Sequence, residues 1–276
     1  MTTAHRLAAL SVFGLAALAA QAPAHAGDTV NVLVLREHGV GSAAQAQPYV
    51  DKFIGLAAKL NGWADGKGKY ETTRGGADGY IQGQKPHYGI LSFGAFLGLQ
   101  GKHKFEAIGQ VNVSKAGGQQ YHLISKTAGD LAGCRGKKLA SDHADDSRFI
   151  DNVVFGGKAR LADFTLVATQ RPMQTIKKVA GDEAECALID DAQYEQLTRG
   201  LEGTAGVRSV WKSDKLPPMV VVAFPSAPAG ERRAFQGNLG KVCEGEGKAA
   251  CAEVGIQSLR SASASDYAAA VAAYAR

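Results

Sequence analysis

Short apolar runs alternate along the chain with longer stretches in which apolar residues recur at helical spacing. The first run, VNVLVL at residues 30–35, is followed by a polar loop, by Pro48 and by a stripe that includes Phe53, Ile54 and Ala57. Proline is favoured in the first turn of a helix, so this pattern predicts a strand and then a helix beginning at Pro48. Such alternation is typical of an α/β fold with parallel strands.

The same reasoning predicts the remaining elements. Apolar and β-branched runs predict a weak strand at 69–76 and further strands at 87–94, 105–113, 121–126, 137–141, 164–169, 186–190, 207–213 and 219–224. Helical spacing predicts helices near 147–155, 172–180 and 191–199, and the alanine-rich tail from Asp266 predicts a terminal helix.

The beginning of the chain has the pattern of a secretory signal peptide. Arg6 precedes an apolar run at residues 7–20 and a small-x-small triplet that ends at Ala26. The run is shorter than the roughly 20 residues of a membrane-spanning helix, so we predict cleavage after Ala26. We therefore expect a soluble protein in the periplasm that is not embedded in the membrane.

Charge argues against nucleic acid as a partner. The net charge is +5, and loss of Arg6 with the signal peptide leaves +4. Lysine and arginine are spread along the chain, without the basic and aromatic interleaving that follows a phosphate backbone.

The four cysteines predict two disulfides, because an even number in an exported chain is typical of paired thiols. Four cysteines allow three connectivities. We favour Cys243 with Cys251, which closes the loop CEGEGKAAC, and Cys134 with Cys186, which precede neighbouring predicted strands. No C-x-x-C spacing suggests a metal site, and we expect no cofactor.

The segment DLAGCRGKKLA at residues 130–140 resembles the type II periplasmic solute-binding proteins, most closely the phosphate, phosphite and phosphonate branch. Three further segments match in the expected order, at residues 88–100, 179–190 and 209–224. The resemblance implies two α/β lobes, each a mostly parallel sheet flanked by helices, joined by crossover strands. Residues 27–115 with 225–276 are expected to form lobe 1, and 116–224 lobe 2.

The resemblance also implies a function. It predicts a monomer without catalytic activity that captures a small polar ligand between the lobes and delivers it to an ABC permease. The ligand is expected to be an oxyanion such as a phosphonate, or a related compound that bears an amino group. The alternatives are an exported hydrolase with a Ser/His/Asp site, for which no G-x-S-x-G or H-E-x-x-H motif is present, and a sensor or accessory subunit.

The polar stretch SDHADDS at residues 141–147 is the most concentrated candidate site. It precedes the apolar stripe of a predicted helix, so its aspartates fall on the first turn. Three interpretations remain open: helix capping, a metal site, and ligand binding by Asp142 or Asp145 with a polar rim. The metal site would use Asp142, His143 and Asp145, and the rim would be formed by Ser141, Ser147 and Arg148. We favour a ligand other than simple phosphate, because carboxylates repel it.

Further candidates follow the other strands, where the cleft of an open α/β sheet forms. These residues are Arg36, His38, Ser42, Ser92, Phe93, Tyr121 and Asp190. Arg36 could bind a carboxylate or phosphonate, or else pair with Glu37. Phe93 could floor the pocket or belong to the core, and Asp190 could bind ligand or cap a helix.

Overall fold

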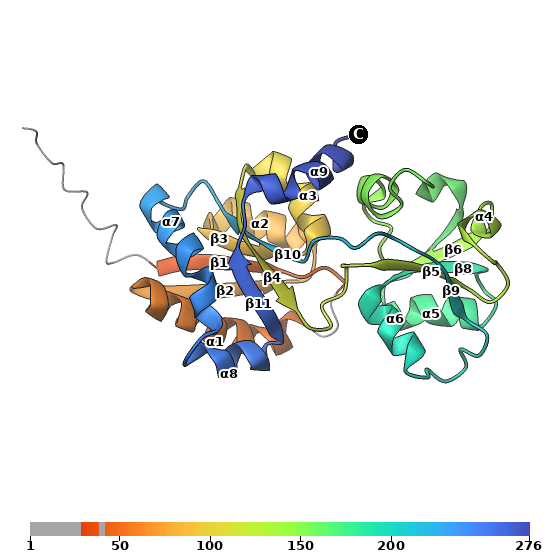
Figure 1. Cartoon of the computed structure of the whole chain (residues 1–276), viewed down its shortest axis with the longest axis horizontal. Coiled ribbons are helices and arrows are strands. Elements are labelled where there is room, and N and C mark those ends of the chain that lie inside the picture. The colour runs from red at the N-terminus through yellow and green to blue at the C-terminus, as the bar shows by residue number, and fades with distance from the viewer. Residues whose placement is uncertain (1–28, 39–41) are drawn as a thin grey trace, which may run out of the picture.

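The computed structural model describes residues 29–38 and 42–276, which form two α/β lobes lying side by side (Figure 1). Lobe 1 contains a six-stranded sheet and lobe 2 a five-stranded sheet. The predicted two-lobe α/β fold is therefore confirmed. The predicted signal peptide lies outside the described residues.

The sheet of lobe 1 has the strand order β11-β4-β10-β3-β1-β2. β1 pairs in parallel with β2 and β3, and β10 pairs antiparallel to both β3 and β4. β3 and β10 are buried along their whole length, as expected for central strands covered on both faces. The strands are β1 (Thr29–Leu35), β2 (Asp65–Glu71), β3 (Tyr88–Leu91), β4 (Glu106–Val113), β10 (Met219–Ala223) and β11 (Ile256–Ser261).

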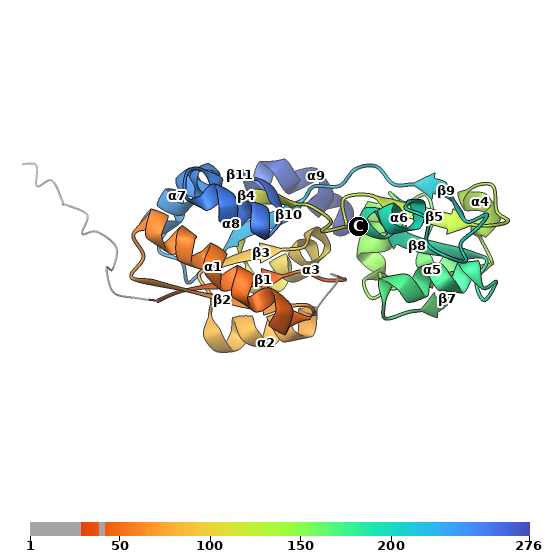
Figure 2. The same ribbon diagram turned by 90° about the horizontal axis from the view of Figure 1, so that it is seen from below.

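Helices cover both faces of this sheet (Figure 2). Successive residues of a strand face opposite sides, so Val221 packs with Phe53 and Phe235 on one face, while Val222 shares the other face with Phe96 and Tyr267. The first face is covered by α1 (Ala43–Asn61), α7 (Ala229–Asn238), η3 (Leu239–Cys243) and α8 (Gly247–Glu253). The second is covered by α2 (Arg74–Gln84), α3 (Phe93–His103) and α9 (Ala264–Tyr274).

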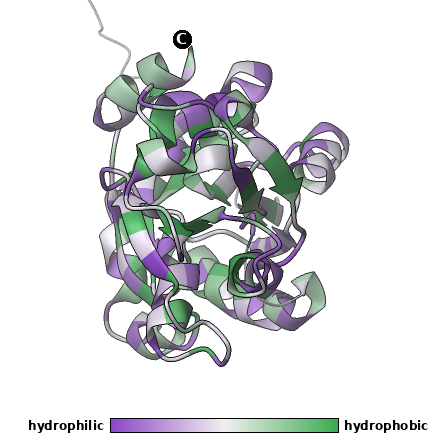
Figure 3. Ribbon diagram, turned by 90° about the vertical axis from the view of Figure 1, so that its right-hand side faces the viewer, coloured by the Kyte–Doolittle hydropathy of each residue, from purple (hydrophilic) through white to green (hydrophobic). Residues whose placement is uncertain are grey.

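Lobe 2 has the strand order β7-β6-β8-β5-β9, with β6 parallel to β7 and β8, and β5 antiparallel to β8 and β9. Its strands are β5 (Tyr121–Ser125), β6 (Lys138–Ser141), β7 (Thr165–Ala168), β8 (Cys186–Asp190) and β9 (Arg208–Lys212). Its helices are α4 (Leu131–Cys134), η1 (Phe149–Val154), η2 (Leu161–Asp163), α5 (Pro172–Ala180) and α6 (Asp191–Thr198). Hydrophobic residues are concentrated in the strands, and the surrounding helices are of mixed character (Figure 3).

The chain crosses between the lobes twice, from β4 to β5 and from β9 to β10. The range expected for lobe 2, 116–224, included β10, but strand pairing places β10 in the centre of the sheet of lobe 1. A buried apolar run does not reveal which sheet it joins, because both lobes offer the same apolar environment. The other lobe boundaries remain predictions.

Some predicted elements differ from the observed ones. α1 begins at Ala43, and Pro48 lies inside it, because Ser42 and Gln45 form a capping box before the proline is reached. The helix expected at 147–155 is largely a π-helix, η1. The glycine-rich α2 and the largely exposed β11 lack a strong apolar period, so neither was predicted from the sequence. α7 and α8 were also not predicted.

Both favoured disulfides are confirmed. Cys134–Cys186 joins the end of α4 to the start of β8, and Cys243–Cys251 joins η3 to α8. In residues 29–38 and 42–276, no helix combines the length and the apolar character needed to span a bilayer.

The two disulfides are expected to contribute unequally to stability. Cys134–Cys186 spans 52 residues and Cys243–Cys251 spans 8, so loop entropy predicts losses of about 4 and about 2.5 kcal/mol when each pair is replaced by alanine. Urea unfolding of the C134A/C186A and C243A/C251A variants measures both losses. Equal losses, or a larger loss for the short loop, would contradict this expectation.

Candidate functional site

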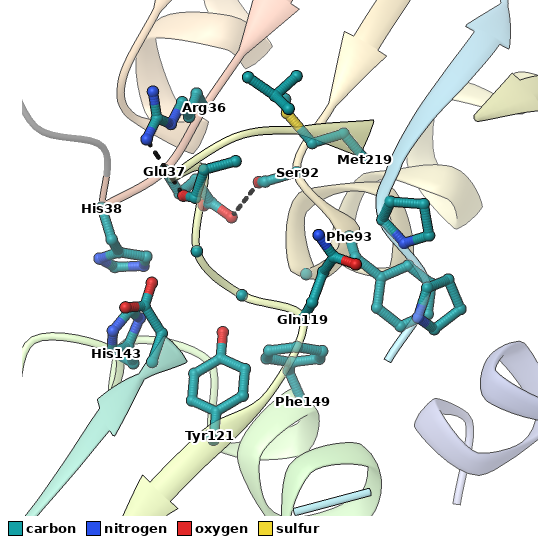
Figure 4. Close-up of a pocket in the computed structure, with 18 of the residues that line it drawn as sticks. Arg36, Glu37, His38, Ser92, Phe93, Gln119, Tyr121, His143, Phe149 and Met219 are labelled. Atoms are coloured by element: carbon teal, nitrogen blue, oxygen red, sulfur yellow. Dashed lines mark hydrogen bonds between the residues drawn. The ribbon is translucent and has the colours of Figure 1, made fainter. Parts of the chain in front are cut away.

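A cleft between the lobes is formed by loops that follow the parallel strands, and by the first crossover (Figure 4). The free space between its walls is about 40 Å³, which leaves room for only a few water molecules. The polar and aromatic residues of the lining are Arg36, Glu37, His38, Arg74, Ser92, Phe93, Gln119, Tyr121, His143, Asp145, Asp146, Phe149 and Asp190.

The wall of lobe 1 centres on Glu37, which follows β1. Its carboxylate accepts hydrogen bonds from Arg74 Nε at 2.6 Å, from Arg74 Nη2 at 3.2 Å and from Ser92 Oγ at 3.2 Å. Ser92 is the N-cap residue of α3 but does not cap that helix with its side chain. Burial raises the pKa of Glu37, while the Arg74 guanidinium opposes that rise.

Arg74 joins the two lobes. Besides Glu37, it donates through Nη1 to Asp146 of lobe 2, and we call these two contacts the Arg74 bridge. Asp146 also accepts hydrogen bonds from the Tyr274 hydroxyl at 3.1 Å and from the Phe149 amide at 3.0 Å. One guanidinium therefore holds carboxylates from both lobes. The Asp146 carboxylate also caps the turn that leads into η1.

Two histidines meet across the cleft, His38 from lobe 1 and His143 from lobe 2, with ring centroids 4.4 Å apart. Burial, followed by the charge of His143, lowers the pKa of His38 to about 4. Burial also disfavours charge on His143, but the carboxylates of Asp142 and Asp190 raise its pKa on balance. Protonation is therefore disfavoured on His38 and favoured on His143.

The residues of the SDHADDS stretch separate in space. His143, Asp145 and Asp146 line the cleft. Asp142 instead accepts hydrogen bonds from Thr175 Oγ1 at 2.9 Å and from Gln193 Nε2 at 2.9 Å. Its carboxylate lies inside lobe 2, which counts against the expectation that it binds ligand.

Three serines predicted to bind ligand, Ser42, Ser141 and Ser147, do not line the cleft. Ser42 is exposed and caps α1. Ser141 is buried, donates to the Leu188 carbonyl at 3.0 Å and accepts from the His143 amide. Ser147 is exposed and does not line the cleft. These three serines therefore lie outside the cleft, whereas Ser92 lines it.

The metal interpretation finds no support in the described part of the chain, where no group of three or more His, Cys, Asp or Glu side chains is placed to hold an ion. Asp145 lies 3.7 Å from His38 Nε2, but its side chain is 62% exposed. Asp142 is occupied by Thr175 and Gln193.

Arg36 contacts the crossover and not Glu37. Its Nη2 donates to the carbonyl oxygens of Lys115 at 2.6 Å and of Ala116 at 3.2 Å. The alternative of an Arg36–Glu37 pair is therefore wrong, since Glu37 pairs with Arg74. The Arg36 Nε is buried without a partner among the described residues.

Asp190 and Tyr121 line the cleft from lobe 2. Asp190 Oδ1 caps α6 through the Gln193 amide at 2.9 Å. Gly117 approaches its Oδ2 so closely, at φ +77°, that a Cβ there would lie 2.0 Å away. The Tyr121 hydroxyl points into the cleft (Figure 4), and burial raises its pKa, so it stays protonated.

Arg74, Gln119 and Phe149 are lining residues that the sequence analysis did not nominate. Arg74 follows β2, so the same strand-end rule that selected Arg36 could have found it. Gln119 lies in the crossover, and Phe149 was assigned only to an apolar helix stripe. Phe149 lies edge-on to Phe93, with ring centroids 6.3 Å apart, so Phe93 both lines the cleft and belongs to the core.

We expect Arg74→Gln to destabilise the protein by about 3 kcal/mol at pH 7, because it leaves the buried Glu37 carboxylate without its counter-charge. Burial already raises the pKa of Glu37, so the loss should shrink at pH 5, where the carboxyl can be protonated. Urea unfolding at both pH values measures this. Arg199→Gln, which breaks an exposed pair with Glu195, is the control and should cost under about 1 kcal/mol. If Arg74→Gln also lost less than about 1 kcal/mol of stability, the Arg74 bridge would not stabilise the protein as we expect.

Comparison with known proteins adds the following findings. Residues 88–267 match the family model for the periplasmic substrate-binding protein of phosphonate ABC transporters. No curated protein matches the sequence. The fold is similar to that of the binding protein component of an ABC phosphonate transporter from Pseudomonas aeruginosa, with TM-score 0.61, 13% identity and coverage of 86% of this chain and 82% of that one.

Two further structures are similar. A Prochlorococcus marinus protein in complex with methylphosphonate has a TM-score of 0.62 at 8% identity, and the match covers 87% of this chain and 94% of that one. A Xanthomonas citri protein bound to ATP has a TM-score of 0.68 at 10% identity, with coverage of 90% and 97%. At these identities the structures bear on the fold alone, whereas the family model spans most of the chain. The chain therefore belongs to the family of periplasmic substrate-binding proteins of phosphonate ABC transporters.

Proposed function

We propose that this periplasmic substrate-binding protein captures a small zwitterion, a compound with an oxyanion group and an ammonium group, and passes it to an ABC permease. The family assignment supports transport. The ligand class rests on one observation: residues that line the same small cleft carry donors and acceptors without hydrogen-bond partners in the described part of the chain.

The donors come from both lobes. His143 Nδ1 and Arg36 Nε are buried without hydrogen-bond partners in the described part of the chain, and the Tyr121 hydroxyl points into the same space. A buried donor without an acceptor is costly. These groups favour a ligand that brings oxygen acceptors.

The acceptors are carboxylate oxygens. Asp190 uses Oδ1 to cap α6, which leaves Oδ2 facing the crossover. Among the described residues, the polar contact of the Asp145 side chain is the long one to His38, at 3.7 Å. A ligand ammonium could bind such oxygens with charge-assisted hydrogen bonds. An oxyanion alone would bring no positive charge to these oxygens.

Simple phosphate fits the cleft poorly. The N-terminus of a helix attracts anions, but at α3 the protein already supplies an anion, because Ser92 donates to the Glu37 carboxylate there. Glu37, Asp145, Asp146 and Asp190 add four carboxylates to the lining, against two guanidinium groups and the His143 ring. The excess favours a ligand that carries positive charge as well.

Hydrolysis is not proposed. Ser92 donates to Glu37 and Ser141 donates to the Leu188 carbonyl, so neither serine is activated by an imidazole. A serine nucleophile needs an adjacent base. We propose a binding protein without catalytic activity, which acts as a monomer.

Export should remove the leader after Ala26. We expect the protein isolated from the periplasm to begin at Gly27, with a mass that matches loss of residues 1–26, and to be monomeric by light scattering. N-terminal sequencing and intact mass spectrometry measure the cleavage. A start several residues away, or a dimer, would contradict that part of the proposal.

The ligand class can be tested with a matched panel: 2-aminoethylphosphonate, ethylphosphonate, ethylamine and inorganic phosphate. At a hundredfold excess over Kd, a ligand stabilises the folded state by about 2.7 kcal/mol. We therefore expect 2-aminoethylphosphonate to raise Tm by about 5–10 °C, and the other three compounds to raise it by much less.

The panel separates the groups by design. Ethylphosphonate keeps the oxyanion and ethylamine keeps the ammonium, so each single-charge compound tests one half of the site. A shift with phosphate equal to that with 2-aminoethylphosphonate would refute the zwitterion proposal. No shift with any compound for a ligand-free protein would refute it as well.

A further inference from the structure

The His143 ring lies in lobe 2, and its two nitrogens differ in their hydrogen bonding. The residue is 4% exposed. Its Nε2 lies 3.0 Å from Gln193 Oε1, whereas Nδ1 has no hydrogen-bond partner in the described part of the chain. The ring lines the cleft, below His38 and beside Tyr121 in Figure 4.

Gln193 determines which nitrogen carries the first proton. Its Nε2 donates to both oxygens of Asp142, at 2.9 and 3.1 Å, and its Oε1 accepts from the Asp190 amide at 2.8 Å. Because a backbone amide can only donate, the amide of Gln193 cannot be turned around. Its Oε1 is therefore an acceptor, and His143 Nε2 must donate to it.

The groups around His143 favour a second proton. Asp142 Oδ1 lies 3.8 Å from Nε2, and Asp190 and Asp145 act in the same direction, which raises the pKa of His143 against the effect of burial. The other titratable neighbours, His38 and Tyr121, are neutral rings whose centroids lie 4.4 and 5.2 Å away. The second proton belongs on Nδ1, since Nε2 already has one.

We propose that His143 is a specificity-determining residue that presents its Nδ1–H as a cationic donor to a negatively charged oxygen of the ligand. This inference rests on the proposed function and assigns the oxyanion end of the zwitterion to lobe 2. Gln193 and Asp142 are positioning residues, because they act on the ligand only through the ring. Binding should then require protonated His143.

Two substitutions separate the two nitrogens. Asparagine places its side-chain nitrogen near the position of Nδ1, whereas glutamine reaches the position of Nε2. His143→Gln can therefore keep the contact with Gln193 and lose the unpartnered nitrogen, and His143→Asn does the reverse.

We expect His143→Gln to weaken binding of 2-aminoethylphosphonate at pH 6 by about 10- to 150-fold, as for loss of a charged hydrogen bond. His143→Asn should weaken it less. Binding to the unmodified protein should weaken as pH rises from 6 to 8.5, and this dependence should be reduced in His143→Asn. Isothermal calorimetry measures all of these values. His122→Gln is the control, because His122 stacks on Tyr194 and does not line the cleft. This variant should bind 2-aminoethylphosphonate with unchanged affinity.

The reverse order of the two variants would overturn the inference, because it would show that His143 acts only by supporting Gln193. Unchanged binding in both variants would also overturn it.

A second measurement does not depend on the zwitterion. Imidazole ¹⁵N spectra of the mature protein, with the His143 signals assigned by their loss in His143→Gln, should show Nε2 protonated throughout and Nδ1 gaining its proton with a pKa above 6.5. If 2-aminoethylphosphonate fails to bind, the ligand class is wrong, and methylphosphonate and inorganic phosphate become the probes. A shift of the Nδ1 signal with either oxyanion supports the inference. No shift with either, or a His143 that remains neutral at pH 5.5, overturns it.

Discussion

One guanidinium holds a carboxylate from each lobe and so links the two lobes directly. Arg74 contacts Glu37 and Asp146 at once, and without it the buried Glu37 carboxylate would lose its counter-charge. The contact also determines what the cleft offers a ligand, because Arg74 and Glu37 largely satisfy each other. Among the described residues, the groups left without partners, His143 Nδ1 above all, are the ones that we propose select a ligand.

The acidic loop before η1 shows how neighbouring residues take different tasks. Asp142 turns into lobe 2 and positions His143 through Gln193. Asp145 remains at the open rim, while Asp146 caps the following turn and contacts Arg74. Capping and ligand binding are alternatives in the sequence analysis, yet Asp146 both caps the following turn and lines the cleft.

Much of the fold could be predicted because the pattern of apolar residues is local. The helix at 172–180 and the strand at 186–190 have the predicted bounds, and chain spacing was enough to favour both disulfides. The direction in which a loop side chain points is instead set by residues far away in the sequence. Asp142 faces inward because Gln193, 51 residues away, donates to it. For the same reason the pairing of Glu37 with Arg74, and the position of β10, required the tertiary structure.

The position of β10 constrains the order in which the lobes can be completed. The strands of lobe 2 form one uninterrupted stretch, with the Cys134–Cys186 bond inside it. The sheet of lobe 1 lacks its central strand until residue 223 arrives, and lacks an edge until residue 261. In a chain that enters the periplasm from its N-terminus, the apolar edges of β3 and β4 therefore stay exposed until β10 arrives between them. Lobe 2, whose strands have all arrived by then, can already assemble.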